Sequence, residues 1–301
     1  MNNSYPLEGI IVPLVTPLNR DGSLDTHSLR AITRHVLAGG VAGLFVLGST
    51  GEFPLLCPED RPRIIATVLE ETQGRVPVLA GVSAPGTAQA LTYCREAEAL
   101  GVAAVVATAP YYYRLHDAVE GYQHFRAIAE GTALPVFLYN IPQFTQMSLA
   151  LDTVQRLAEL LNVVGMKDSS SDFTYFARLC LRLKRDRSRL GLYQGNECHL
   201  LASLALGAAG GVSGLGNVAP QLVVQLWRAF QAGDFAQAKE AQEKIVSLFD
   251  IARLGPNAIP AIKAALSELG LCSPQVASPL QPLDDDQRAQ VRIKLEELAL
   301  L

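Results

Sequence analysis

A lysine stands at the end of the apolar run Val163-Val164-Gly165-Met166, and this residue, Lys167, is the first lysine of the chain. Burial disfavours the charged form of an amine and lowers its pKa, and a neutral amine attacks ketones to give a Schiff base. The protonated imine withdraws electrons from the neighbouring carbon, so that a carbon–carbon bond can form or break there. Arginine stays protonated and cannot replace lysine in this chemistry. Lys167 is therefore predicted to be a nucleophile.

A second interpretation of Lys167 is a structural lysine paired with Asp168. Consecutive residues of a strand point to opposite faces, which argues against that pairing. Tyr139, near the end of the apolar run 135–142, also has two interpretations. Its phenol could shuttle protons beside Lys167, or its ring could belong to the core with a satisfied hydroxyl.

The stretch Gly48-Ser49-Thr50-Gly51-Glu52 ends another apolar run. The hydroxyls of Ser49 and Thr50 and the nearby backbone N–H groups could bind a carboxylate, because glycines such as Gly51 let the chain approach closely. An ordinary turn between a strand and a helix explains the same residues equally well. The pattern leaves both alternatives open.

Apolar, β-rich runs recur along the chain with amphipathic stretches between them. The runs cover residues 9–17, 43–52, 76–83, 103–112, 135–142, 163–170, 191–196 and 210–217. Strands that alternate with helices predict parallel βαβ units, and near-continuous apolar strands predict that both faces are covered. Eight units favour the α/β class with a (β/α)8 TIM barrel over an open doubly wound sheet, since no GxGxxG follows the first run.

Four helical segments follow the eighth run with no strand between them. They cover residues 220–232, 234–254, 257–269 and 284–299. The first completes the barrel, so we expect a barrel carrying the active site at 1–232 and a C-terminal helical region at 233–301. Because chemistry in such barrels takes place at the carboxyl ends of the strands, the polar groups above are expected to face one cavity.

The composition argues against several other classes of protein. The 301 residues are 49% hydrophobic with a formal net charge of -4, and the basic run 182–187 fits a helix end better than a nucleic-acid patch. Five cysteines without a CxxC pair favour a reducing cytoplasm over a disulfide framework. No run predicts a membrane span or a signal peptide, and no histidine and carboxylate spacing predicts a metal site.

Taken together, the motifs resemble the dihydrodipicolinate synthase / N-acetylneuraminate lyase family of class I aldolases. GSTGE at 48–52, APYYY at 109–113, YNIP at 139–142 and GMKD at 165–168 follow the order and spacing of that family. The resemblance covers nearly the whole chain. It implies a barrel with C-terminal helices, assembled as a homotetramer of tight dimers, and no cofactor beyond a Schiff base on Lys167.

The resemblance also implies a role for each candidate residue. Lys167 would bind pyruvate or another 2-keto acid covalently, and Tyr139 would transfer protons. Ser49 and Thr50, with their backbone amides, would hold the carboxylate of the keto acid. Tyr112 is similar to the tyrosine that reaches into the site of the neighbouring subunit.

Three further positions are expected to shape the substrate pocket. Val212 matches a position that packs near the bound keto acid. Phe144 stands where dihydrodipicolinate synthases carry an arginine for the carboxylate of the second substrate, and an apolar ring cannot neutralise a carboxylate. Glu197 lies in a stretch, GNEC at 195–198, that is less acidic than the polyol-binding stretch of sialic acid lyases. These departures favour a lyase that cleaves or forms a 2-keto-3-deoxy sugar acid, with pyruvate and an aldehyde as partners.

Three alternatives to this function stay open. The chain could catalyse the synthase reaction despite Phe144, or it could eliminate water from a keto-deoxy acid through the same imine. A non-catalytic ligand-binding barrel is a different class of protein with the same fold. Its mark would be the loss of Lys167 or Tyr139, and both residues are present.

Overall fold

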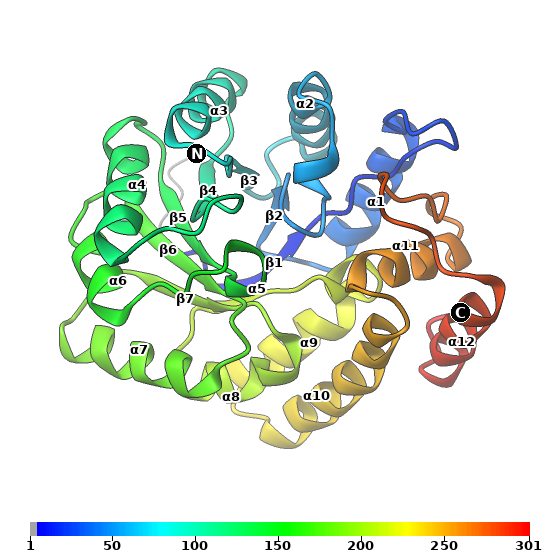
Figure 1. Ribbon diagram of the computed structural model, residues 1–301. Helices are drawn as coiled ribbons and strands as arrows, with labels where there is room; N and C mark the ends of the chain where they lie inside the picture. Colours follow the sequence, from blue (N-terminus) through cyan, green and yellow to red (C-terminus); the bar gives the residue numbers. More distant parts are fainter. Residues whose placement is uncertain (1–4) are drawn as a thin grey trace.

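The computed structural model describes residues 5–301, which form a closed barrel of eight parallel strands in the order β1 to β8 (Figure 1). The strands are β1 (Gly9–Pro13), β2 (Gly43–Val46), β3 (Val78–Gly81), β4 (Ala104–Thr108), β5 (Val136–Asn140), β6 (Val163–Asp168), β7 (Gly191–Gln194) and β8 (Gly210–Val212). Each lies inside one of the eight apolar runs, so the predicted (β/α)8 class is confirmed. The first four residues of the predicted barrel, 1–4, lie outside the described residues.

Helices surround the barrel and continue beyond it. They are α1 (Thr26–Ala38), α2 (Asp60–Thr72), α3 (Thr87–Leu100), α4 (Ala118–Glu130), α5 (Pro142–Thr145), α6 (Leu151–Leu157), α7 (Phe173–Arg185), α8 (Leu200–Ala205), α9 (Pro220–Gln231), α10 (Phe235–Phe249), α11 (Ala258–Glu268) and α12 (Asp285–Glu297). Helix α9 packs against β1 and α1, α10 packs against α9, and α11 packs against α12 (Figure 1). The predicted C-terminal helices are therefore present.

Alternate residues of each strand belong to two separate apolar clusters. On β5, Val136 and Leu138 pack outward against the helices, whereas Phe137 and Tyr139 belong to the smaller cluster inside the barrel. This alternation is the period of two that a strand imposes on its side chains. Both faces of the sheet are therefore covered, as the apolar runs predicted.

Glycines let the barrel close between its first and last strands. Gly9 pairs with Gly210, and a Cβ atom on Gly210 would come within 1.7 Å of the carbonyl oxygen of Gly9. Only a residue without a side chain leaves the backbones of β1 and β8 free to approach this closely.

Among residues 5–301, no single helix combines the length and the apolar character needed to cross a membrane. Helix α10 with its continuation to Arg253 passes that test only together with α11, as a pair bent by 110°. All five cysteines are free.

Candidate active site

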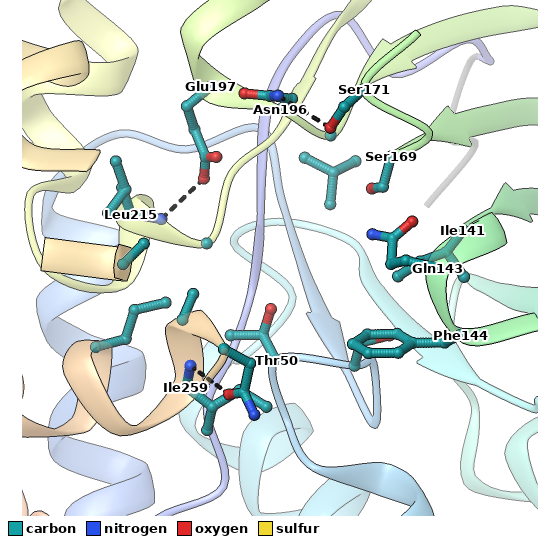
Figure 2. A pocket seen from close by; sticks show the side chains of 18 of the residues that line it. Thr50, Ile141, Gln143, Phe144, Ser169, Ser171, Asn196, Glu197, Leu215 and Ile259 are labelled. Carbon is teal, nitrogen blue, oxygen red and sulfur yellow. Dashed lines mark hydrogen bonds between the residues drawn. The ribbon is translucent and has the colours of Figure 1, made fainter. Parts of the chain in front are cut away.

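A pocket of about 450 Å³ opens at the carboxyl ends of the strands. Seven of the nine predicted site residues line it: Ser49, Thr50, Tyr139, Phe144, Lys167, Glu197 and Val212. Figure 2 shows side chains from the strand ends and from the C-terminal helices pointing into one space. The geometry that the strand-end rule predicted is therefore present, and the roles of the individual residues stay predictions.

Lys167 is buried at the base of this pocket, with 5% of its surface exposed. It pairs with Tyr139 across the β5–β6 ladder, and its Nζ lies 4.2 Å from the centroid of the Tyr139 ring. The ring of Phe45 is 5.8 Å from the same atom. No carboxylate of residues 5–301 forms an ion pair with Lys167. The amine therefore lies among rings and does not neutralise an acid.

Asp168 lies on the opposite face of β6, outside the pocket. Its carboxylate accepts hydrogen bonds from the Nδ2 of Asn140 at 2.7 Å and from the hydroxyl of Ser170 at 3.0 Å. Burial raises the pKa of Asp168, and these hydrogen bonds oppose the shift. The structural interpretation of Lys167, a pair with Asp168, is wrong.

The loop after β2 forms part of the pocket wall with Ser49 and Thr50. The N–H groups of Gly51 and Glu52 donate to the carbonyls of Gly48 and Ser49, each at 3.0 Å, and so form a tight turn. In the described chain, no backbone acceptor takes the N–H groups of Ser49 and Thr50, whose residues line the pocket. This arrangement leaves donors available for an anion.

Gly51 lies behind the pocket wall and not in it. Its N–H group is used within the turn, and its carbonyl accepts a hydrogen bond from the hydroxyl of Thr16 at 2.8 Å. A Cβ atom at this position would lie 3.0 Å from the carbonyl oxygen of Leu14. Gly51 therefore lets the turn pack against the segment that follows β1, and the structure does not bring it to the substrate space.

Tyr112 is the second predicted residue that the structure of one chain leaves outside the pocket. It is 74% exposed. Among the aromatic contacts of residues 5–301, its ring contacts only that of Tyr113, which is also exposed, at 5.0 Å between centroids. Its neighbour Tyr111 is packed against Phe53 instead. Within one chain, Tyr112 does not meet Lys167.

Glu197 is held firmly at the rim of the pocket. One carboxylate oxygen accepts hydrogen bonds from the hydroxyl of Ser213 and from the N–H group of Leu215, both at 3.0 Å. Its backbone carbonyl accepts a hydrogen bond from the side chain of Gln242 at 2.9 Å. Figure 2 shows the side chain pointing toward Leu215. The carboxylate is therefore fixed in place.

Several residues of the wall were not predicted from the sequence. Polar ones are Gln143, Ser169, Ser171 and Asn196, and apolar ones from the C-terminal region include Phe249, Ile259 and Ile262. Ser169 and Ser171 lie two and four residues after Lys167, so their closeness to the predicted nucleophile could have indicated them. Nothing in the helical pattern of 233–301 indicated that this region forms part of a pocket wall. The predicted barrel, 1–232, therefore does not carry the whole site by itself.

The charges around the pocket are few. Among residues 5–301, Lys167 and Glu197 are the only charged residues of its wall, and no arginine lines it. Phe144 occupies the wall on α5 and is half exposed. Within residues 5–301, no three side chains of histidine, cysteine, aspartate or glutamate cluster as metal ligands. The wall offers one amine, one phenol, one carboxylate, hydroxyls, side-chain amides and free backbone donors.

Comparisons with known proteins place nearly the whole chain within one family. The model of the dihydrodipicolinate synthetase family matches residues 6–298. An uncharacterized DapA-like lyase of Halobacterium salinarum is 38% identical, over 98% of this chain and 95% of that protein. The 4-hydroxy-tetrahydrodipicolinate synthase of Leptothrix cholodnii is 36% identical, over 98% and 99%. The crystal structure of YagE, a prophage protein from E. coli K12 in complex with pyruvate, superposes with a TM-score of 0.94 at 31% identity, over 98% of this chain and 100% of that one.

Proposed function

This chain belongs to the dihydrodipicolinate synthetase family of aldolase-type lyases, and we propose that it cleaves or forms a 2-keto-3-deoxy sugar acid through a Schiff base on Lys167. The observation that carries the proposal is the composition of the pocket wall. Within the part of the chain that the structure describes, Lys167 is buried beside Tyr139 without an acidic partner, and no arginine lines the pocket. The amine supplies the chemistry, and the rest of the wall selects the substrate.

The reaction begins when the neutral amine of Lys167 adds to the C2 carbonyl and water leaves. The protonated imine then accepts the electron pair of the C3–C4 bond, which breaks to give an enamine and a carbonyl group at C4. The proton of the C4 hydroxyl passes through the phenol of Tyr139, whose ring lies 4.2 Å from Nζ. Protonation of the enamine at C3 and hydrolysis of the imine release pyruvate, and no cofactor takes part.

The carboxylate of the keto acid is proposed to bind the loop after β2. Ser49 and Thr50 line the pocket with hydroxyls and with backbone N–H groups that are free of backbone acceptors in the described chain. Hydrogen bonds from such donors to an anion are stronger than those between neutral groups. This contact orients the C2 carbonyl toward Lys167.

The remaining wall favours an uncharged, hydroxyl-rich end of the substrate. In Figure 2, Ser169, Ser171, Asn196 and Glu197 gather across the pocket from Thr50. The Nδ2 of Asn196 donates to the hydroxyl of Ser171 at 3.1 Å, which leaves amide and hydroxyl groups for sugar hydroxyls. A second carboxylate would meet Phe144 and Glu197, and burying an unpaired charge there is unfavourable.

Two related reactions are the competing candidates. The names of relatives such as the Leptothrix cholodnii enzyme favour 4-hydroxy-tetrahydrodipicolinate synthesis, in which the second substrate would need a partner that Phe144 does not provide. Elimination of water from a keto-deoxy acid uses the same imine and the same wall. A barrel without catalysis is disfavoured, since both Lys167 and Tyr139 are in the pocket.

An assembly of identical chains is also proposed, as a dimer of dimers. Tyr112 and Tyr113 expose large aromatic surfaces beside the loop after β4, and such surfaces are common at protein interfaces. The five free cysteines support a reducing location such as the cytoplasm. Nucleic acids and membranes are not among the proposed partners.

Borohydride trapping tests the imine. Treatment with pyruvate and sodium borohydride should add mass to the peptide that contains Lys167, and Lys167→Ala should abolish the adduct. Lys263 is a matched internal control, because it is also buried but forms an ion pair with Glu52. An adduct absent from Lys167, or equal on both lysines, would rule out the proposed chemistry.

Product analysis then separates the candidate reactions. A panel of 2-keto-3-deoxy acids should yield free pyruvate and an aldehyde, which an enzyme that only eliminates water does not release. Complementation of a strain that requires diaminopimelate tests the synthase reaction. Growth of that strain, together with no pyruvate release from any sugar acid, would favour the synthase instead.

A further inference from the structure

A buried ion pair connects the loop after β2 to the C-terminal helices. The carboxylate of Glu52 contacts the Nζ of Lys263 on α11, and both side chains are 0% exposed. The second oxygen of Glu52 accepts a hydrogen bond from the N–H group of Ala277 at 2.6 Å. The Nζ of Lys263 also donates to the carbonyl of Gln275 at 2.8 Å. The loop after β2 therefore meets α11 and the segment that follows α11 at one carboxylate.

Glu52 has a backbone that needs external support. Its φ of 59° lies in the left-handed region, which a residue with a side chain adopts at an energetic cost. Its N–H group donates to the carbonyl of Ser49 at 3.0 Å, and this carbonyl shares a peptide group with the N–H of Thr50. The next residue, Phe53, donates to the carbonyl of Gly48 at 3.4 Å, which shares a peptide group with the N–H of Ser49. The conformation of Glu52 therefore bears on the orientation of both N–H groups. The contacts with Lys263 and Ala277 hold this conformation in place.

Net stability alone is a weak explanation for the pair. Removing two charges from water costs free energy that their attraction roughly offsets, so apolar replacements of buried pairs are often as stable. A buried charge is stable only beside its partner, so the pair fixes the position of the loop after β2 relative to α11. On the other side of the pair, α11 carries Ile259 and Ile262 in the pocket wall. The pair thus joins two walls of the same pocket.

We propose that Glu52 and Lys263 are positioning residues, which aim the backbone N–H groups of Ser49 and Thr50 at the carboxylate of the keto acid. The inference rests on the proposed function, because that function assigns the carboxylate to this loop. Neither residue lines the pocket around Lys167, so both act through the loop.

The test compares a keto acid with a ketone that has no carboxylate. Borohydride trapping on Lys167 is measured against the concentration of pyruvate and, separately, of acetone, for the wild type, Glu52→Gln and Lys263→Met. We expect the half-saturating concentration of pyruvate to rise about tenfold or more, as for the loss of one hydrogen bond to a charge. The response to acetone should stay within about twofold, since acetone does not use the carboxylate donors.

Two further variants separate positioning from stability. Glu52→Gln/Lys263→Met leaves no unpaired buried charge, so it should melt above either single variant while its half-saturating pyruvate concentration stays raised. Asn162→Ala is the matched control. It removes a side-chain amide that donates to the carbonyl of Ala129 at 2.8 Å, at the end of β6 away from Lys167, and should lower the melting temperature without changing trapping.

Parallel losses with pyruvate and acetone, no change with either, or recovery of wild-type pyruvate binding in the double variant would each overturn the inference. Absence of any adduct in the wild type would refute the proposed function instead. In that case hydrogen exchange of the peptide covering 47–56 still decides the inference. Exchange that is faster in both single variants supports it, and unchanged exchange overturns it.

Discussion

Lys167 and Asp168 are adjacent in the chain and have different surroundings. The strand turns Lys167 toward the rings of Tyr139 and Phe45, and it turns Asp168 toward the hydrogen-bond donors of Asn140 and Ser170. The amine is thereby separated from the acid that would otherwise neutralise it. The period of two along β6 is sufficient to produce this separation.

His124 is a buried titratable residue outside the pocket. Its Nε2 must carry the hydrogen, because its partner at 3.2 Å is the carbonyl of Thr108, which can only accept. Its Nδ1 therefore accepts from the hydroxyl of Thr87 at 2.9 Å. Burial lowers the pKa of His124 to about 4, and the carbonyl of Thr108 partly opposes the shift.

This pKa predicts a loss of stability in acid. Between pH 6.5 and 4 the unfolded chain binds a proton that the folded chain does not, so the free energy of unfolding falls as the pH falls. The loss should approach about 3 kcal/mol for a shift of this size. His124→Gln keeps hydrogen-bonding groups but does not titrate. Denaturant unfolding from pH 7 to 4 should show a shallower decline for this variant, and equal slopes would contradict the assigned cause.

At the residue scale, the sequence was sufficient to predict which side chains line the pocket when those residues lie at or just after the end of a strand. Lys167, Tyr139, Ser49 and Thr50 came together for that reason. Gly51 is one residue further along, where hydrogen bonds within the turn decide which groups face the pocket. The spacing of apolar residues in the sequence does not predict which residues of such a turn face the pocket.

At the scale of elements, β1 and β8 approach each other closely where the barrel closes. Gly9 and Gly210 pair there with no room for a methyl group between the backbones. Eight strands were predictable because each is a separate apolar run. The contribution of α11 to the pocket wall was not predictable, because this helix lies outside the repeating strand–helix units and no preceding strand indicates which way it faces.

Gly210→Ala is predicted to destabilise this contact. The added Cβ atom would overlap the carbonyl oxygen of Gly9, and backbone cannot move aside as a flexible side chain can. We expect a loss of about 3 kcal/mol or more in the free energy of unfolding, measured by urea denaturation. Gly86→Ala is the matched control, since nothing lies within 4 Å of its added Cβ atom, and it should stay within about 0.5 kcal/mol. Equal losses in the two variants would contradict the proposed overlap.

At the scale of the whole molecule, Tyr112 is exposed in the single chain and would be covered only in the proposed assembly. The side chain of Tyr112 is 74% exposed and does not line the pocket of its own chain. In a two-fold dimer, each chain can supply this residue to the other. One chain could not reveal this from its own sequence, because the contact would involve a second copy.

Mixing two inactive variants tests this arrangement. Lys167→Ala retains Tyr112, and Tyr112→Phe retains Lys167, so a mixed dimer should contain one complete site. Refolding the two together should restore about one quarter of the wild-type activity, because half of the dimers are mixed and half of their sites are complete. Size-exclusion chromatography with a tag on one variant confirms that mixed dimers form. No recovery in confirmed mixed dimers would mean that Tyr112 does not act across the interface.

The pocket wall also has a consequence for how this fold can diversify. Lys167 and Tyr139 lie on neighbouring strands inside the barrel, whereas Phe144, Asn196 and Ile259 come from α5, the segment after β7 and α11. A mutation in one of these outer segments would change what fits beside the proposed imine and leave the amine of Lys167 in place. Descendants of one ancestral gene could therefore keep the proposed bond-breaking step while each lineage evolves specificity for a different aldehyde.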